Sequence, residues 1–94
     1  MHSVYIVFSK FLNKYYVGES VDVKSRIEQH NTGYYAKSFT SSTNDWVLFV
    51  EIICDSKGQA LKIESHIKKM KSKNYIQNLK RYPELVLKLK EQYN

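Results

Sequence analysis

The chain is poor in three residue types that would otherwise decide its class. Among its 94 residues there are one cysteine (Cys54), one proline and three glycines. A single cysteine excludes an internal disulfide and a cysteine-rich zinc site. Because 43% of the residues are hydrophobic and glycine and proline are scarce, a collagen-like or intrinsically disordered chain is excluded as well.

Long hydrophobic runs are also missing. No apolar stretch reaches the roughly 20 residues that a membrane-spanning helix needs, and the first residues lack the hydrophobic region of a signal peptide. Ninety-four residues suffice for one domain with a modest core. We therefore expect a single domain over residues 1–94 that is cytoplasmic and has no membrane partner.

Positive charge is abundant, and it is concentrated in the second half of the chain. There are 15 Lys and Arg against 9 Asp and Glu, a formal net charge of +6. Residues 1–56 carry five basic and six acidic side chains, whereas residues 57–94 carry ten basic and three acidic ones. A basic half is typical of proteins that bind a polyanion such as nucleic acid. Lysine-rich helices are as often simply solvated faces, and charge alone does not separate these interpretations.

The first half of the chain shows a strand pattern, then a helix pattern. Residues 4–8 and 15–17 are β-branched and aromatic, and the short polar connection between them predicts an antiparallel hairpin. A helix is expected over 22–31, ending near Gly33. The run 46–54 is the most hydrophobic of the chain and predicts a buried central strand.

Three helices are expected in the second half. The first begins after the turn at Asp55–Gly58, the second after Ser72, and the third at Pro83. The order β-β-α-β-α-α-α predicts an α/β domain of the α+β type, a three-stranded antiparallel sheet flanked by helices. Its core would span residues 4–80, and its C-terminal helix residues 83–92.

Four side chains near the start could carry chemistry, although each also has an ordinary structural interpretation. Tyr5 and Tyr16 lie in the two expected strands of the hairpin, where tyrosines usually pack with their hydroxyl at the rim. Arg26 and His30 lie one turn apart on the expected helix. They could bind a phosphate and move a proton, or be a surface arginine and a helix-end histidine.

Glu64 is the one carboxylate in a lysine-rich stretch of the second half. Mg²⁺ usually binds proteins through one or two carboxylates and keeps some of its waters. Glu64 could serve in that way, or it could form an ordinary ion pair with Lys68 four residues later. Its own position does not decide between the two.

The spacing of these residues resembles the GIY-YIG nuclease superfamily. Ser3-Val4-Tyr5 is followed after ten residues by Tyr16-Val17-Gly18, which resembles the paired motif that names the family. Arg26, His30 and Glu64 fall where the family has its helix arginine, a histidine or tyrosine, and its metal-binding glutamate.

Further segments resemble the small stand-alone bacterial branch, which is similar to the N-terminal nuclease domain of the excinuclease C subunit. They are Gln29–Gly33, Trp46–Leu48 and Ala60–Lys68. The resemblance covers residues 4 to about 80. It departs at Glu19, where some members have a lysine whose role Lys37 could take over.

The resemblance implies a metal-dependent endonuclease that hydrolyses phosphodiester bonds in DNA, in repair or recombination. It implies that Glu64 holds one Mg²⁺ or Mn²⁺ ion, that Tyr5 is the general base and that Tyr16 positions water or phosphate. Arg26 would hold phosphate oxygens and His30 would relay a proton or donate to phosphate. Gly18 would let the backbone pass close to the site.

The basic half would then bind the backbone of the nucleic-acid substrate. The enzyme is expected to be a monomer. The expected contacts are Lys37, Lys68, Lys69, Lys71 and Lys73. Two alternatives remain open at this point. The domain could be a non-catalytic nucleic-acid-binding module that retains the nuclease fold, or residues 72–94 could dock a protein partner. The family's late asparagine could be Asn74 or Asn78.

Overall fold

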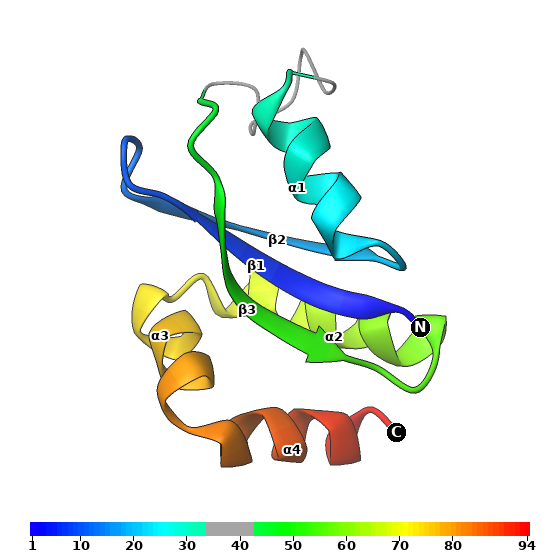
Figure 1. Cartoon of the computed structure of the whole chain (residues 1–94). Helices are drawn as coiled ribbons and strands as arrows, with labels where there is room; N and C mark the ends of the chain where they lie inside the picture. Colours follow the sequence, from blue (N-terminus) through cyan, green and yellow to red (C-terminus); the bar gives the residue numbers. More distant parts are fainter. Residues whose placement is uncertain (34–42) are drawn as a thin grey trace.

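The computed structural model describes residues 1–33 and 43–94, so Lys37 lies outside the described residues. Three strands and four helices follow one another in the order that the sequence predicts (Figure 1). In chain order they are β1 (Ser3–Ser9), β2 (Lys14–Ser20), α1 (Val23–Asn31), β3 (Val47–Ile53), α2 (Lys57–Met70), α3 (Lys73–Arg81) and α4 (Pro83–Gln92). The predicted α+β fold is therefore confirmed.

Local bonds within the chain explain where the helices begin. The side chains of Asp22, Ser56 and Ser72 each accept a hydrogen bond from a backbone N–H of the first turn that follows. These bonds satisfy donors that the helix itself leaves unpaired. Pro83 opens α4, a position where its missing N–H costs nothing. Within the described ranges, no helix is long and apolar enough to cross a bilayer.

The sheet is antiparallel, with the strand order β2-β1-β3. The hairpin between β1 and β2 turns at Asn13, whose φ of 53° is left-handed. Tyr5 lies opposite Gly18 and Val7 lies opposite Tyr16. Because cross-strand partners share a face, the side chains of Tyr5 and Tyr16 project from the same face of the sheet.

The prediction that the run 46–54 forms a buried central strand is wrong. β1 is the central strand, and β3 lies at an edge with Val47, Leu48 and Ile53 about half exposed. The helix α1 packs against β1 and β2 on its face of the sheet. Hydrophobicity alone misled the prediction because β3 is covered mainly on its other face, where Ile52 is buried.

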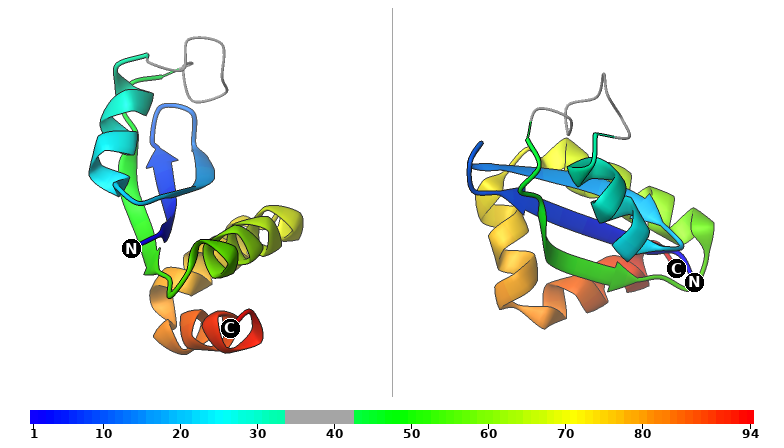
Figure 2. Two further views of the ribbon diagram at one scale, coloured as in Figure 1. Left: turned by 90° about the vertical axis from the view of Figure 1, so that its right-hand side faces the viewer. Right: turned by 45° about the horizontal axis from the view of Figure 1, so that its top comes forward.

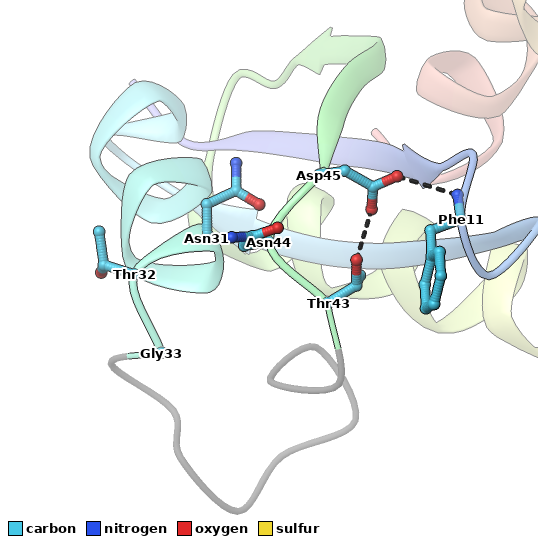
Figure 3. Close-up of a pocket in the computed structure, with 7 residues that line it drawn as sticks. All are labelled: Phe11, Asn31, Thr32, Gly33, Thr43, Asn44 and Asp45. Atoms are coloured by element: carbon cyan, nitrogen blue, oxygen red, sulfur yellow. Dashed lines mark hydrogen bonds between the residues drawn. The ribbon is translucent and has the colours of Figure 1, made fainter.

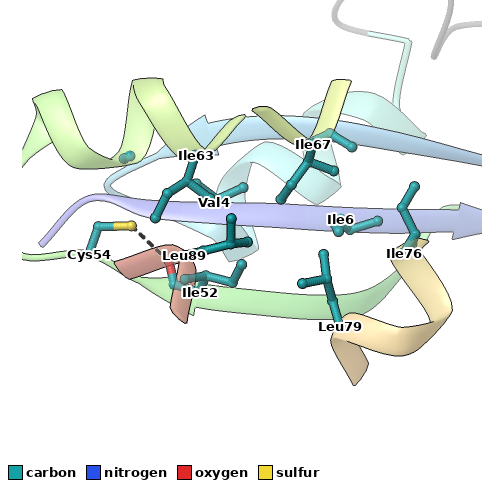
Figure 4. Packing of buried hydrophobic residues seen from close by; sticks show 11 residues of the cluster. Val4, Ile6, Ile52, Cys54, Ile63, Ile67, Ile76, Leu79 and Leu89 are labelled. Atoms are coloured by element: carbon teal, nitrogen blue, oxygen red, sulfur yellow. Dashed lines mark hydrogen bonds between the residues drawn. The ribbon is translucent and has the colours of Figure 1, made fainter. Parts of the chain in front are cut away.

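The sheet separates two cores because side chains of β1 alternate between its faces. Val4 and Ile6 pack against the larger helical layer, which includes Ile63, Ile67 and Leu79 (Figure 4). Tyr5 and Val7 face α1, in a smaller cluster with Val23 and Trp46. Figure 2 shows α1 on one side of the sheet and α2 and α4 on the other. The edge strand β2 therefore has α1 on one of its faces and α2 on the other.

Candidate active site

Tyr5 lies directly over Gly18. A β-carbon built on Gly18 would be 2.4 Å from the Tyr5 hydroxyl oxygen and 2.5 Å from Cζ. Real β-carbons essentially never approach another atom so closely, so only glycine leaves this space open. Gly18 thus matters here because it makes room for the ring of Tyr5, which is 1% exposed.

The hydroxyl of Tyr5 is bonded to the ring of His30. The oxygen and Nε2 are 2.9 Å apart in a buried setting. Burial, and to a lesser degree the positive charge of Arg26 one turn earlier, lower the pKa of His30. His30 is therefore neutral at pH 7, and a neutral Nε2 can accept the proton of the Tyr5 hydroxyl.

Tyr16 lies beside the same histidine. Its ring meets the ring of His30 edge to face, with 5.2 Å between centroids, and it approaches Trp46 at 6.5 Å. Unlike Tyr5, Tyr16 is only partly buried. Both tyrosines therefore contact His30, Tyr5 from inside the core and Tyr16 from a partly exposed position.

Asn31 and Trp46 form a support that the sequence did not predict. The Asn31 amide donates to the Trp46 carbonyl at 2.9 Å and accepts from the Trp46 N–H at 2.8 Å. This pair fixes the C-terminal end of α1 to the start of β3, and so it holds His30 and Trp46 against Tyr16. Both residues belong to segments that carry the family resemblance, which was the signal available for them.

Glu64 reaches this region from α2 through Lys68. The Lys68 ammonium is 3.0 Å from Oε2 of Glu64, so the ion pair weighed above is present. The same Nζ lies 5.8 Å from the centroid of the Tyr16 ring. Contacts therefore run without a break from Glu64 through Lys68, Tyr16 and His30 to Tyr5.

This chain of contacts joins two strands and two helices at the β2 edge of the sheet. Arg26 adds its charge from α1, where it acts on His30. Of the predicted site residues, Tyr5, Tyr16, His30 and Glu64 are linked by direct contacts through Lys68, and Gly18 touches Tyr5.

A basic groove adjoins these residues. It has a volume of about 470 Å³ and an apolar floor that includes Val17, Ile67 and Ile76. Its cationic lining consists of Lys14, Lys68, Lys71 and Lys73. Lys14 was not among the predicted contacts, whereas Lys73 was, and its ammonium donates to the Asn13 carbonyl at 2.8 Å.

A second hollow of about 360 Å³ continues along α2. It is lined by Glu64, Ser65, Lys68, Lys69 and Lys71. The two hollows share Lys68 and Lys71, so the predicted basic residues of α2 gather next to the carboxylate. This places positive charge next to Glu64 and Tyr16.

Few of the described side chains near Glu64 could serve as ligands of a metal ion. In residues 1–33 and 43–94 there is no cluster of three or more His, Cys, Asp or Glu side chains that could hold a metal ion. Glu64 offers a single carboxylate, and the ammonium of Lys68 at 3.0 Å shows that a cation reaches it. One carboxylate completed by waters and a substrate phosphate is a usual arrangement for Mg²⁺, so the residues fit such an ion.

Glu19 has a partner of its own. Its carboxylate pairs with Nδ1 of His2, just before β1. Residue 19, where the resemblance leads us to expect a lysine in some family members, therefore carries an acidic side chain that is paired with His2. It contributes no ammonium to the site.

A separate pocket of about 750 Å³ lies at the C-terminal end of α1, where Asn31, Thr32 and Gly33 line it (Figure 3). Asp45 in its wall accepts hydrogen bonds from the hydroxyls of Ser9 at 2.6 Å and Thr43 at 2.7 Å, and from the Phe11 N–H at 2.9 Å. These bonds lower the pKa of Asp45 to about 2. They tie the hairpin to the segment before β3, so Asp45 has a structural role.

Comparison with known proteins identifies related sequences over most of the chain. The model of the GIY-YIG catalytic domain matches residues 1–79. A UPF0213 protein of Syntrophus aciditrophicus (strain SB) is 35% identical over 69 residues, which are 73% of this chain and 79% of that protein. No solved structure gives a significant match.

Proposed function

The chain belongs to the GIY-YIG family and carries its nuclease domain, and we propose that it is a metal-dependent endonuclease that hydrolyses phosphodiester bonds in DNA. We further propose that it acts as a cytoplasmic monomer in repair or recombination. The observation that supports the activity is the unbroken set of contacts from Glu64 through Lys68, Tyr16 and His30 to Tyr5.

Tyr5 and His30 would together remove the proton of the attacking water. Hydrolysis of a phosphodiester needs a base at the water and positive charge where the phosphate becomes more negative. A free tyrosine has a pKa of about 10, so its hydroxyl must lose its proton to a partner in order to act as a base. Neutral His30, 2.9 Å away, would accept the hydroxyl proton as the Tyr5 oxygen takes the proton of the water.

The remaining residues would hold the phosphate. Arg26 would bind its non-bridging oxygens through the guanidinium, and half-buried Tyr16 would position the phosphate beside Tyr5. Glu64 would hold one Mg²⁺ or Mn²⁺ ion, which supplies positive charge for the scissile phosphate and its leaving oxygen. The lysines of the two hollows would bind the neighbouring phosphates, and Lys14 joins the predicted Lys68, Lys69, Lys71 and Lys73 in that role.

The test is cleavage of plasmid, branched, single-stranded and RNA substrates with Mg²⁺ or Mn²⁺, comparing wild type with Glu64→Gln. We expect the variant to lose at least about a hundredfold in cleavage rate while keeping its fold, because the carboxylate acts on the transition state. Glu84→Gln is the matched control, since it removes an exposed carboxylate from α4. Equal cleavage by wild type and Glu64→Gln would contradict the assignment.

A non-catalytic nucleic-acid-binding module is the second candidate. The observation that favours it is the pairing of Glu19 with His2, at a position where some family members have a lysine. Under this alternative, wild type binds nucleic acid in a salt-dependent way but cleaves none of the substrates with either metal ion.

A further inference from the structure

Lys68 occupies the position next to the carboxylate that the proposed function assigns to the metal ion. Its Nζ is 3.0 Å from Oε2 of Glu64, whose side chain is 18% exposed. A carboxylate that is largely withdrawn from water attracts a nearby cation more strongly than an exposed one. The ammonium is thus the cation that neutralises Glu64 within the protein itself.

The same lysine belongs to the surface that would bind DNA. It lines both basic hollows, and its Nζ lies 5.8 Å from the Tyr16 ring centroid. Lys71 also lines both hollows, but in the described part of the chain no carboxylate pairs with it. Lys68 therefore differs from Lys71 in that Glu64 would compete with a bound phosphate for its ammonium.

We propose that Lys68 is an intramolecular competitor of the divalent metal ion at Glu64, and that metal binding releases its ammonium to contact DNA phosphate. This inference rests on the proposed function, because it takes Glu64 as the metal ligand. A divalent ion held by Glu64 would repel an ammonium 3.0 Å from Oε2, so each cation would weaken the binding of the other. Metal and DNA then bind cooperatively, because each favours the state in which Lys68 has left Glu64.

An ordinary exposed ion pair of this spacing would have a much smaller effect. Pairs at i, i+4 on a helix change equilibrium constants by about twofold. Competition predicts a larger effect on metal affinity. In wild type the metal must break the ion pair of Glu64 and also bind against the repulsion of the ammonium, whereas in the variant without the ammonium it does neither. We expect Lys68→Met to bind Mn²⁺ about threefold to tenfold more tightly than wild type.

The first experiment measures Mn²⁺ binding in the absence of DNA, through paramagnetic broadening of the backbone amide signals around Glu64. Lys68→Arg should remain close to wild type, because it keeps a cation at the carboxylate. Lys62→Met is the matched control, since it removes the same charge from an exposed position on the same helix. If Lys68→Met and Lys62→Met have the same Mn²⁺ affinity, the competition does not exist.

The second experiment measures the affinity for a fluorescent short DNA duplex in EDTA, as a double-mutant cycle. With Glu64 present, Lys68→Met should lower the affinity by less than about twofold, because the ammonium is already engaged. In the Glu64→Gln background the ammonium is released, so Lys68→Met should cost clearly more. Equal effects in the two backgrounds would overturn the inference, since additivity means that the two side chains do not interact.

The two proposals fail in different ways. If Mn²⁺ broadens the same signals equally in wild type and Glu64→Gln, Glu64 is not the metal ligand, and both the metal assignment and the competition are wrong. If broadening depends on Glu64 but Lys68→Met does not tighten it, the metal assignment stands and only the competition is wrong.

Discussion

Tyr5 and Gly18 face each other across β1 and β2 so closely that any side chain on residue 18 would overlap the tyrosine ring. The pair is in direct register, and a β-carbon at Gly18 would lie 2.4 Å from the Tyr5 hydroxyl oxygen. A glycine inside a strand commonly marks the close approach of another group. Here the approaching group is the side chain that we propose as the base.

Gly18→Ala should therefore damage both stability and the site. The new methyl group forces the Tyr5 ring away from its bond with His30, at a cost of about 1–3 kcal/mol in the free energy of unfolding. Urea denaturation measures that cost, and cleavage assays measure the loss of activity. Gly58→Ala is the control, because its β-carbon meets only Ser56 Oγ at 3.9 Å and lies in a helix, where alanine is favoured. Similar losses in the two variants would show that the contact is unimportant.

The environment of His30 predicts a titration that differs from that of a free histidine. Burial and then the charge of Arg26 lower its pKa, so an NMR titration should find it below 6.5. In Arg26→Gln the pKa should rise but remain below 6.5, because burial is the larger cause and is retained. A titration at 6.5 or above in wild type would contradict the described environment.

The same shift sets the sign of a stability effect. Between the lower folded pKa and the unfolded value of about 6.5, the unfolded chain binds a proton at His30 that the folded chain does not. The contribution of His30 is therefore complete above pH 6.5 and is lost as the pH falls through the folded pKa. In urea denaturation, the difference between wild type and His30→Gln should shrink over that range.

Local structure could be predicted because its causes lie within a few residues. The caps at Asp22, Ser56 and Ser72 each bond to an N–H three residues later, and Pro83 starts its helix by its own geometry. The place of β3 could not be predicted in this way. Whether a hydrophobic strand lies at the centre or at an edge depends on which distant strands pair with it, and β1 is paired on both sides.

The residues of the candidate site could be predicted from the sequence, but the contacts between them could not. Its main residues were identified by resemblance to a family, and membership of that family is confirmed by the match over residues 1–79. The contacts that assemble them were not predicted, because they join distant parts of the chain. Asn31 and Trp46 are 15 residues apart in sequence, and Lys68 reaches Tyr16 from the far side of the sheet edge.

Asp45 predicts a loss of stability in acid. Hydrogen bonds from Ser9, Thr43 and Phe11 lower its pKa to about 2, below the 3.8 of the unfolded chain. The carboxylate therefore stabilises the fold fully above about pH 4, and this contribution is lost as the pH falls through about 2. Asp45→Ala should be less stable than wild type in urea at pH 7, and the difference should decrease towards pH 2. If the stability difference between wild type and Asp45→Ala is constant with pH, the ionised carboxylate of Asp45 does not stabilise the fold.

The lysines of the basic hollows should determine how strongly DNA binding depends on salt. Lys69 and Lys71 line the hollow that contains Glu64, and each phosphate contact contributes about 0.9 to the slope of log affinity against log salt concentration. In the double variant Lys69→Gln/Lys71→Gln we expect that slope to fall by up to about 1.8. Fluorescence anisotropy with a labelled duplex over a range of salt concentrations, in EDTA, measures it.

The control must remove the same net charge from elsewhere. Lys57→Gln/Lys88→Gln does so at two exposed positions, in α2 and α4. General attraction between a basic protein and DNA depends on total charge, whereas counterion release depends on which side chains touch phosphates. If both double variants lose the same slope, net charge alone governs binding and the hollows are not the contact surface. A loss confined to Lys69 and Lys71 would place the DNA backbone along the C-terminal part of α2, next to Glu64.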